Sequence, residues 1–234
     1  MKTLVIMPTY NEIENLSTSV NSILKHVATV EILIVDDASP DGTGMLADEL
    51  AAADSRISVL HRNSKDGLGA AYLHGFEWAL KRHYELVVEM DADGSHRAID
   101  LPKLLDAATN ADLVIGSRWV AGGEVLNWPA HRKLISRVGN IYAHLMLRTQ
   151  IKDMTAGFRV FRISFLRQMN LHGVAARGYA FQVEMAMRVH QQGGRIREVP
   201  ITFVERNHGA SKMTTAIVLE ALWLVTKWGF YRSA

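Results

Sequence analysis

Apolar runs and helix-like stretches alternate through the first half of this 234-residue chain. The runs lack polar alternation, which is typical of strands buried on both faces of a sheet. The predicted strands are Thr3–Pro8, Glu31–Val35, Ile57–His61, Glu85–Met90 and Leu113–Gly116. The predicted helices between them are Glu14–His26, Thr43–Ala53, Leu68–Arg82 and Asp100–Asn110. Because strand–helix–strand units cross over with one hand, the alternation predicts an α/β fold with a mostly parallel sheet flanked by helices.

The second half of the chain has a different pattern after Gly123. Longer helix-like pieces are predicted there at His131–Leu147, Gly178–Gln192 and Thr214–Tyr231, with one short strand at Ile196–Phe203. Most residues in segments such as Asp153–Arg159 are expected to lie in the core or in turns. No internal repeat, low-complexity tract or linker separates the halves. We therefore expect one domain over residues 1–234, in which the second half completes the fold and covers the site.

Composition narrows the class of protein. The residues are 48% hydrophobic, enough for a substantial core, and the formal net charge of +2 does not favour broad nucleic-acid binding. The chain has no cysteine, which excludes disulfides, thiolate zinc sites and cysteine nucleophiles and is compatible with a reducing cytosolic setting. The ten histidines lack metal-ligand spacing. No apolar run is long enough to span a membrane, and the N-terminal run Leu4–Met7 is too short for a signal peptide.

Two carboxylates one residue apart, Asp91 and Asp93, follow the fourth predicted strand. In an open α/β sheet, ligands bind outside the carboxyl ends of the strands. Paired carboxylates repel each other unless a cation lies between them, and oxygen ligands suit Mg²⁺ or Mn²⁺, which also bind phosphates. The motif therefore predicts a metal ion held against a nucleotide diphosphate. A polar turn after the strand is the alternative for an isolated Asp-x-Asp.

Further polar residues follow the first two predicted strands. In the run Pro8–Glu12, the side chains of Tyr10 and Glu12 can stack on and hydrogen-bond a nucleobase, although the same run can simply begin a helix capped by its asparagine. Asp37, after the second strand, favours a ribose or base contact. Asp41 instead fits a structural role as a helix cap.

Cationic side chains form a second group of candidate ligands. Arg118 follows the fifth predicted strand at a position suited to a phosphate, with a surface ion pair as the alternative. Arg132 and Ser136 are four residues apart on one predicted helix, so they share a face and predict an anion site unless that face is merely solvated. Arg206 and Lys212 belong to a basic, glycine-containing loop that can wrap an anionic group or lie on the surface.

These motifs, in this order, resemble those of the family 2 glycosyltransferases with the GT-A (Rossmann-like) fold, and within that family those of the polyprenol (dolichol) monophosphate mannose synthases. The matching segments are Pro-Thr-Tyr-Asn-Glu, Asp-Asp-x-Ser-Pro-Asp-Gly-Thr, Gly-Leu-Gly-Ala-Ala, Asp-Ala-Asp, Gly-Ser-Arg-Trp-Val-x-Gly-Gly, Thr-x-Gly-Phe-Arg and Arg-x-x-Gly-x-Ser-Lys. They span roughly residues 3 to 212, and the ordered set is very specific.

The resemblance implies a role for each candidate residue. GDP-mannose would be held by Pro8, Tyr10, Glu12, Asp37 and Ala92, with Asp91 and Asp93 binding Mg²⁺ or Mn²⁺ on its diphosphate and Arg206 and Lys212 closing over the phosphates. The lipid phosphate would be held by Arg118, Arg132 and Ser136, and the catalytic residues would be Asp91, Asp93 and Arg118. Ser95 stands where some relatives have a glutamine metal ligand, and its hydroxyl is a weaker ligand that water can replace.

The resemblance also implies an activity, which is inverting transfer of mannose from GDP-mannose to a polyprenyl phosphate. Residues 1–123 would be the nucleotide-sugar-binding half and residues 124–213 the acceptor-binding half. One alternative is a related enzyme that uses UDP-glucose or another nucleotide sugar with a lipid phosphate. Another is a non-catalytic nucleotide-sugar-binding subunit of a membrane transferase, against which the intact Asp-x-Asp and basic loops argue.

The C-terminal segment, residues 214–234, is rich in tryptophan and aliphatic residues. Glu220 and Lys227 interrupt it, so we expect no transmembrane span but either a helix in the membrane interface or a core helix. Many relatives add transmembrane helices after the catalytic domain, and a separate membrane-anchoring protein could replace them here. We expect a cytoplasmic protein bound peripherally to the cytoplasmic face of a membrane.

Overall fold

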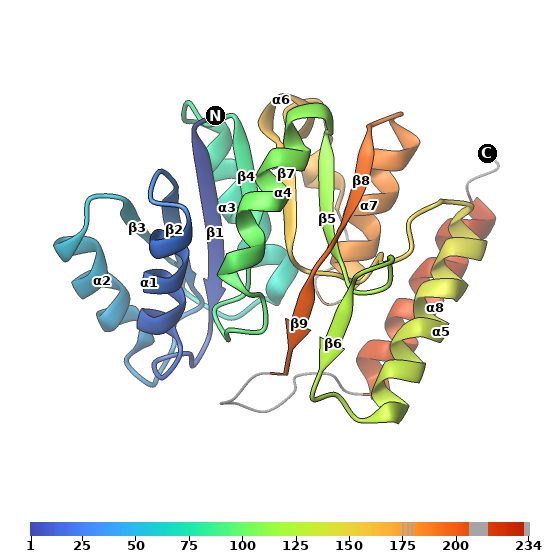
Figure 1. Ribbon diagram of the computed structural model, residues 1–234, viewed down its shortest axis with the longest axis horizontal. Helices are drawn as coiled ribbons and strands as arrows, with labels where there is room; N and C mark the ends of the chain where they lie inside the picture. Colours follow the sequence, from blue (N-terminus) through green and yellow to red (C-terminus); the bar gives the residue numbers. More distant parts are fainter. Residues whose placement is uncertain (175, 177, 179, 206–214, 232–234) are drawn as a thin grey trace.

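A seven-stranded sheet runs through the centre of the protein (Figure 1). The computed structural model describes residues 1–174, 176, 178, 180–205 and 215–231. In spatial order the strands are β3 (Ile57–His61), β2 (Glu31–Asp36), β1 (Thr3–Thr9), β4 (Leu86–Glu89), β7 (Arg159–Arg162), β5 (Leu113–Ser117) and β8 (Ile196–Pro200). Neighbours pair in parallel except β7, which is antiparallel to both β4 and β5. The predicted α/β fold with a mostly parallel sheet is confirmed.

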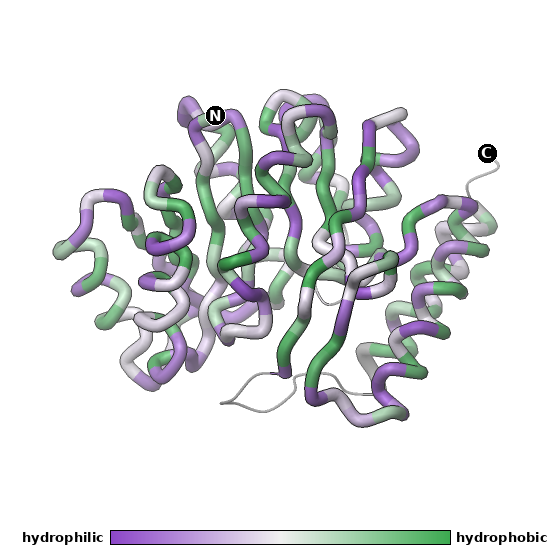
Figure 2. Tube along the Cα trace, viewed as in Figure 1, coloured by the Kyte–Doolittle hydropathy of each residue, from purple (hydrophilic) through white to green (hydrophobic). Residues whose placement is uncertain are grey.

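Helices cover both faces of the sheet, as the buried strands require. One face packs against α1 (Leu16–His26), α2 (Thr43–Ala53) and α4 (Leu101–Ala107). The other packs against α3 (Leu68–Leu80), α5 (Ala130–Leu147), α7 (Ala180–Gln191) and α8 (Thr215–Tyr231). The short elements are α6 (Ile163–Leu166) and the 3₁₀ turns Ala98–Asp100, Ala108–Asn110 and Leu171–Gly173. Figure 2 shows apolar residues along the central strands and alternating character along α5.

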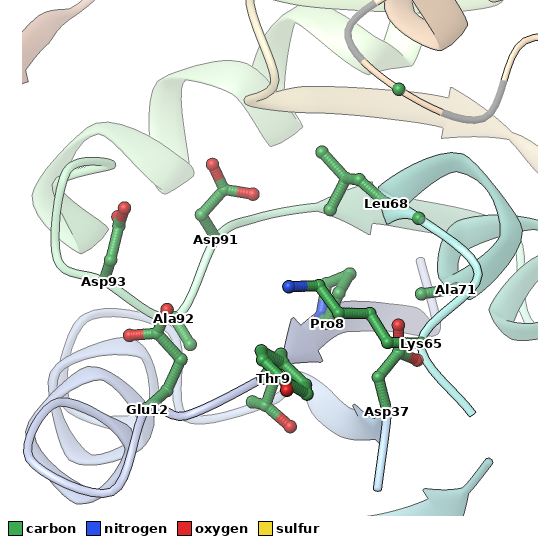
Figure 3. Close-up of a pocket in the computed structure, with 13 residues that line it drawn as sticks. Pro8, Thr9, Glu12, Asp37, Lys65, Leu68, Ala71, Asp91, Ala92 and Asp93 are labelled. Carbon is green, nitrogen blue, oxygen red and sulfur yellow. The ribbon is translucent and has the colours of Figure 1, made fainter. Parts of the chain in front are cut away.

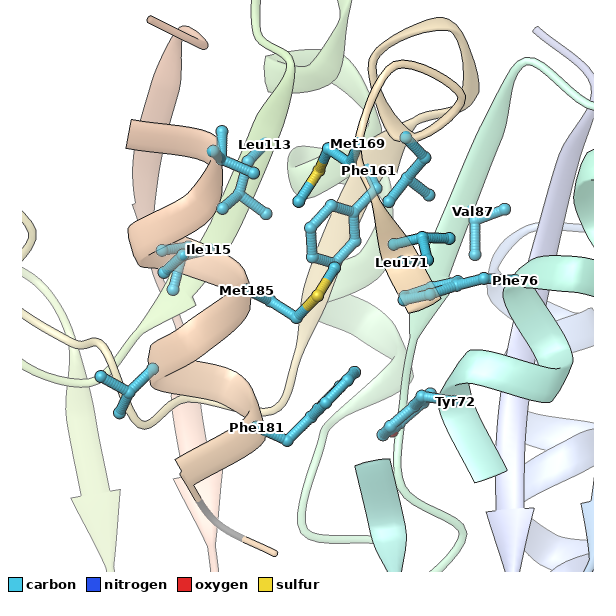
Figure 4. Close-up of a cluster of buried hydrophobic side chains, with 14 of the residues drawn as sticks. Tyr72, Phe76, Val87, Leu113, Ile115, Phe161, Met169, Leu171, Phe181 and Met185 are labelled. Carbon is cyan, nitrogen blue, oxygen red and sulfur yellow. The ribbon is translucent and has the colours of Figure 1, made fainter. Parts of the chain in front are cut away.

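The central strand β1 shows why these runs lack polar residues. Successive side chains of a strand point to opposite faces, and here both faces are buried. Leu4 and Ile6 enter the cluster under α3, whereas Val5 and Met7 enter the cluster under α1. The first cluster is rich in aromatic rings (Figure 4), and the ring of Phe161 on β7 meets Phe76 edge-on at 5.5 Å between centroids.

Several elements differ from the predicted ones. β7 and the short strand β6 (Glu124–Leu126) are absent from the predicted strands. The predicted strand Ile196–Phe203 is two strands in the structure. β8 ends at Pro200, which has no N–H to donate to a neighbouring strand. β9 (Thr202–Val204) then pairs with β6 in a separate small sheet. α1 begins two residues later than predicted, and its N-cap is Asn15 and not Asn11. The Asn11 backbone instead has φ 57°, and its N–H donates to the Ser39 hydroxyl.

The C-terminal helix α8 lies along α5 (Figure 1). Gly229 allows the close approach, since a Cβ there would lie 2.9 Å from the Met146 carbonyl oxygen. The Tyr142 and Thr226 hydroxyls are hydrogen-bonded across the pair at 2.5 Å. Val225 is buried, which gives α8 a core face. Among the helices that the structure describes, none is long and apolar enough to cross a membrane.

Candidate active site

A cavity of about 310 Å³ lies at the carboxyl ends of β1, β2 and β4 (Figure 3). The predicted nucleotide-sugar residues within the described part of the chain all line it, namely Pro8, Tyr10, Glu12, Asp37, Asp91, Ala92 and Asp93. The wall also includes Gly67, Leu68 and Ala71 of the Gly-Leu-Gly-Ala-Ala motif, a glycine-rich helix start that can approach a phosphate closely, together with Thr9, Lys65 and Gly178. Residues from three separate strand ends therefore meet in one cavity, as the sheet topology requires.

The Asp-x-Asp pair is held by its own loop and by α3. The Tyr72 hydroxyl donates to Asp91 Oδ1 at 3.2 Å, and the Asp91 N–H donates to His96 Nδ1 at 3.1 Å. Asp93 Oδ1 accepts from the Ser95 N–H at 3.0 Å. Burial raises the pKa of Tyr72 well above its usual value, and the Asp91 charge adds to the effect, so the phenol stays a neutral donor. These bonds fix the two carboxylates before any ligand binds.

A buried acid lies behind the pair. Glu89 is the last residue of β4, and neither of its carboxylate oxygens accepts a well-formed hydrogen bond from the described residues. Burial raises the pKa of Glu89 to about 8, although the nearby Arg159 guanidinium and the Gln182 amide oppose the shift. Arg159 itself donates to the carbonyls of Met154, Ala156 and Gln182. A protonated Glu89 adds no negative charge behind the Asp-x-Asp pair.

The cavity suits a divalent metal ion held together with a phosphate-bearing ligand. Asp91 and Asp93 offer hard oxygen donors, and the Asp91 side chain is one-third exposed toward solvent. No group of three or more acidic, histidine or cysteine side chains with metal-binding geometry occurs in the described ranges. Mg²⁺ typically uses one or two carboxylates and completes its shell with phosphates and water, so two carboxylates are sufficient. The Ser95 hydroxyl is enclosed and outside the cavity wall, and its role as a weak third ligand stays a prediction.

Two cationic side chains, Arg62 and Lys65, lie at the opposite end of the cavity, near Asp37 and Tyr10. Arg62 donates to Asp37 Oδ1 at 2.5 Å, and both side chains are buried. Burial raises the pKa of Asp37, while the Arg62 charge opposes that rise. The Lys65 ammonium lies 3.8 Å from the centroid of the Tyr10 ring. Lys65 thus brings a positive charge to the end of the cavity that Tyr10 and Asp37 line, and its turn carries no motif that could have predicted this.

Asp41 has a structural role, but the prediction that it caps the helix is wrong, because the N-cap residue of α2 is Gly42. Its Oδ1 accepts from the backbone N–H of Thr43 at 3.0 Å and from the Thr43 hydroxyl at 2.6 Å, and its Oδ2 accepts from the Ile13 N–H at 3.3 Å. These bonds join the loop after β1 to the start of α2. Asp41 is absent from the cavity wall, in contrast to Asp37.

The predicted lipid-phosphate residues lie outside this cavity, around one indole ring. The Arg132 guanidinium carbon is 4.1 Å from the centroid of the Trp128 ring, and that of Arg118 is 5.6 Å from it. Phe203 meets the Trp128 ring edge-on at 5.3 Å and the His96 ring at 5.6 Å. Because His96 also contacts Asp91, this aromatic cluster adjoins the Asp-x-Asp pair. Ser136 lies one turn after Arg132 on α5.

Arg118 forms a buried ion pair with Asp153. Its guanidinium makes a two-point contact with Asp153, Nε to Oδ2 at 2.8 Å and Nη2 to Oδ1 at 2.6 Å, and donates to the Thr155 hydroxyl at 2.8 Å. The surface ion pair considered for Arg118 is wrong, because the Arg118 and Asp153 side chains are 7% and 0% exposed. Arg206 and Lys212, predicted to close over the donor phosphates, lie outside the described residues.

Known proteins resemble this chain over nearly its whole length. The model of the glycosyl transferase family 2 matches residues 4–169. The chain is 53% identical over 229 residues to the undecaprenyl-phosphate mannosyltransferase of Micrococcus luteus, covering 98% of this chain and 94% of that protein. It is 51% identical over 230 residues to the polyprenol monophosphomannose synthase of Mycolicibacterium smegmatis, covering 97% and 87% respectively.

Solved structures share the fold at much lower identity. Glucosyl-3-phosphoglycerate synthase of Mycobacterium tuberculosis in complex with UDP superposes with a TM-score of 0.69 at 17% identity, covering 99% of this chain and 79% of that chain. A mannosyltransferase of Pyrobaculum calidifontis in complex with GDP-Man and Mn²⁺ gives a TM-score of 0.61 at 18% identity, covering 98% and 72%. These likenesses confirm the GT-A fold, and a second complex of the mycobacterial synthase also contains Mn²⁺.

Proposed function

The chain belongs to the family 2 glycosyltransferases, and from this premise we propose that it transfers mannose from GDP-mannose to a polyprenyl phosphate. The observation that carries this proposal is the single cavity lined by the Asp-x-Asp pair and by the other nucleotide-sugar residues of the described chain. The names of the two relatives support the mannosyl donor and the lipid acceptor, since each relative is more than half identical over nearly the whole chain.

The donor would lie with its nucleoside near Asp37 and Tyr10 and its diphosphate near Asp91 and Asp93. Mg²⁺ or Mn²⁺ bound by these two acids would act as a Lewis acid that neutralises charge on the departing diphosphate. The Tyr72 hydroxyl keeps the Asp91 carboxylate in position, and Lys65 adds a cation at the nucleotide end. Preorganised charges of this kind stabilise the transition state without reorganisation during the reaction.

The acceptor would be held by Arg132, Ser136 and Arg118, beside the Asp-x-Asp pair. A phosphate monoester is largely a dianion at pH 7, so its oxygen needs positioning more than it needs a general base. That oxygen forms a bond to the anomeric carbon as the bond from that carbon to GDP breaks on the opposite side. The configuration is inverted, and the product is a β-linked mannosyl phosphate lipid.

We further propose that the protein binds peripherally at the cytoplasmic face of a membrane through the outer face of α5. Leu134, Val138, Ile141 and Leu145 recur there at helical spacing and are each more than half exposed. Arg132 and Ser136 lie on the opposite side of the helix by the same geometry. The segment Ala130–Leu147 contains basic but no acidic residues, a composition that suits an anionic lipid surface.

The decisive experiment is product analysis with the purified protein, a polyprenyl phosphate, Mg²⁺ or Mn²⁺ and a panel of nucleotide sugars. We expect a mannosyl phosphate lipid from GDP-mannose and little product from UDP-glucose. Preferential use of UDP-glucose would identify the related lipid-phosphate glycosyltransferase instead. Binding of nucleotide sugar without turnover in every combination would indicate a non-catalytic subunit.

A further inference from the structure

The two arginines of the predicted acceptor site have counter-ions of different character. Asp153 is fully buried, makes a two-point contact with the Arg118 guanidinium, and also accepts from the Arg118 backbone N–H at 2.9 Å. Its own N–H donates to Glu198 at 2.9 Å. An entering anion cannot replace Asp153 without leaving a carboxylate buried and unpaired, which is strongly unfavourable.

Arg132 has a counter-ion that can be replaced. Its guanidinium contacts Glu205 through one nitrogen and one carboxylate oxygen, and the two side chains are 20% and 30% exposed. Partly exposed single-contact ion pairs are worth about 1 kcal/mol or less. The Arg132 guanidinium also stacks on the Trp128 ring, so the cation stays in position when the carboxylate leaves.

The small sheet of β6 and β9 positions Glu205 beside Arg132. Glu205 follows β9 directly, and its N–H donates to the Leu126 carbonyl of β6 at 3.3 Å. Phe203, two residues earlier, contacts the Trp128 ring and lies 5.5 Å from the Arg118 guanidinium carbon. Because residues two apart share a face of an extended chain, Phe203 and Glu205 both point toward Trp128 and the two arginines.

Resting on the proposed function, we propose that Glu205 is an internal anion that occupies Arg132 until the acceptor phosphate displaces it. The acceptor enters as a phosphate monoester and leaves as a phosphodiester, and both must compete with the same carboxylate. Glu205 must leave Arg132 before any other anion binds there, and the free energy of that step is the same for each anion. The competition therefore reduces the affinity of every anion at Arg132 by a common factor. Glu205 thus weakens retention of the mannosylated product and acts on the reaction through Arg132, as a positioning residue.

The test is direct binding to the full chain without turnover. The probes are a short-chain polyprenyl phosphate and its mannosylated phosphodiester, measured by calorimetry with the wild type and Glu205→Gln. We expect both dissociation constants to fall by the same factor, about fivefold, which corresponds to an ion pair of about 1 kcal/mol. In turnover, KM for the lipid phosphate should fall and product inhibition should strengthen in Glu205→Gln.

Three variants separate this role from a merely structural one. Glu124→Gln on β6 removes the same charge from an exposed position of the paired strand and should leave both constants unchanged. Glu205→Asp retains a carboxylate and should stay closer to the wild type than Glu205→Gln. In an Arg132→Ala background the Glu205→Gln effect should vanish, because the cation for which the two anions compete is gone.

Weaker or unchanged binding of both probes by Glu205→Gln would overturn the inference and leave the proposed function standing. Failure of the wild type itself to bind the lipid phosphate would instead refute the acceptor of the proposed function, and the inference with it. Thermal unfolding of each variant checks that the comparison is made between folded proteins.

Discussion

At the scale of single residues, Asp91 and Asp93 provide the test of metal dependence. Asp91→Asn and Asp93→Asn keep the side-chain volume but remove the charge that a divalent ion requires. We expect each variant to lose transfer activity by at least about a hundredfold, a loss on the order of 3 kcal/mol of transition-state stabilisation. Chelator should abolish the wild-type activity reversibly, with Mg²⁺ or Mn²⁺ restoring it. Full activity in excess chelator would contradict the metal assignment.

Arg118 has a different expected phenotype from Arg132. Arg118→Ala leaves Asp153 fully buried without its counter-ion, so the free energy of unfolding should fall by about 3–5 kcal/mol. Arg132→Ala breaks a partly exposed pair, and the fall should stay within about 1 kcal/mol. Denaturant unfolding of the two variants measures the difference. Equal stability losses would mean that the Arg118–Asp153 contact is weaker than its geometry indicates.

Lys65 is the cavity cation that had not been predicted. Lys65→Met keeps the length of the side chain and removes the charge near Tyr10, so GDP affinity should fall by roughly tenfold, the effect of about 1.4 kcal/mol. Calorimetry with GDP alone, in the absence of acceptor, measures it. Lys81→Met at the end of α3 is a control of the same chemistry on an exposed position outside the cavity wall. Equal GDP affinity in all three proteins would exclude a nucleotide contact for Lys65.

At the scale of elements, hydropathy predicted the parallel strands because their side chains are apolar on both faces. It did not predict β7, since Arg159 and Arg162 flank only two apolar residues in this four-residue strand. The Arg159 guanidinium is satisfied inside the protein by three backbone carbonyls, a solution that exists only in the folded structure. β7 then separates β4 from β5, so the second half of the chain supplies an inner strand of the sheet in addition to Trp128, Arg132 and Phe203.

The candidate site likewise contains residues that could be predicted from the sequence and residues that could not. Strand-end positions such as Asp37 and Asp91 could be predicted because topology alone brings the carboxyl ends of parallel strands together. The partners of Arg118 and Arg132 could not, because Asp153 and Glu205 are distant in sequence and reach the arginines only once β7 and β9 have joined their sheets.

Asp112 and Arg195 form an ion pair at the start of the parallel strands β5 and β8. The contribution of this pair to the free energy of unfolding should decrease in acid. Hydrogen bonds from Arg195 lower the pKa of Asp112 below its usual value. A carboxyl group with a lowered folded-state pKa stabilises the protein above the unfolded-state pKa and loses that effect as the pH falls through the folded-state value. Asp112→Asn should therefore lower the free energy of unfolding by up to about 1 kcal/mol near neutral pH, and by progressively less below the ordinary Asp pKa of about 3.9. Urea unfolding in neutral and in acidic buffer measures this, and a difference independent of pH would contradict the ion-pair origin.

At the scale of the whole molecule, α5 and α8 form one end of the protein (Figure 1). Both helices expose apolar side chains to solvent. Both interpretations of the C-terminal segment are supported in part. Val225 and Leu224 pack with the core cluster, whereas Leu219, Trp223 and Phe230 are exposed. Deleting residues 214–234 would uncover the core face as well, so it cannot separate membrane docking from stability. Substitutions confined to the exposed side chains can.

We expect the double substitution Val138→Gln and Leu145→Gln to reduce flotation with anionic liposomes while leaving thermal stability nearly unchanged, because both side chains are already exposed. Fully burying a Leu or Val side chain contributes about 1.5–3 kcal/mol. Loss of interfacial burial at both positions should therefore lower the partitioning of the protein onto liposomes by at least roughly tenfold. Activity on long-chain polyprenyl phosphate in liposomes should fall in parallel, and activity on a short, soluble analogue should not.

The control for this membrane test is an exposed apolar side chain at the other end of the molecule. Met45 on α2 is 71% exposed, and α2 lies at the end of the protein opposite α5 (Figure 1), so Met45→Gln should leave flotation unchanged. Unchanged flotation of the double variant would move the membrane contact to α8, where Trp223→Ser tests it. Equal loss of activity on the long-chain and the soluble acceptor would show instead that the apolar face of α5 supports the active site itself, because only a membrane contact distinguishes the two acceptors.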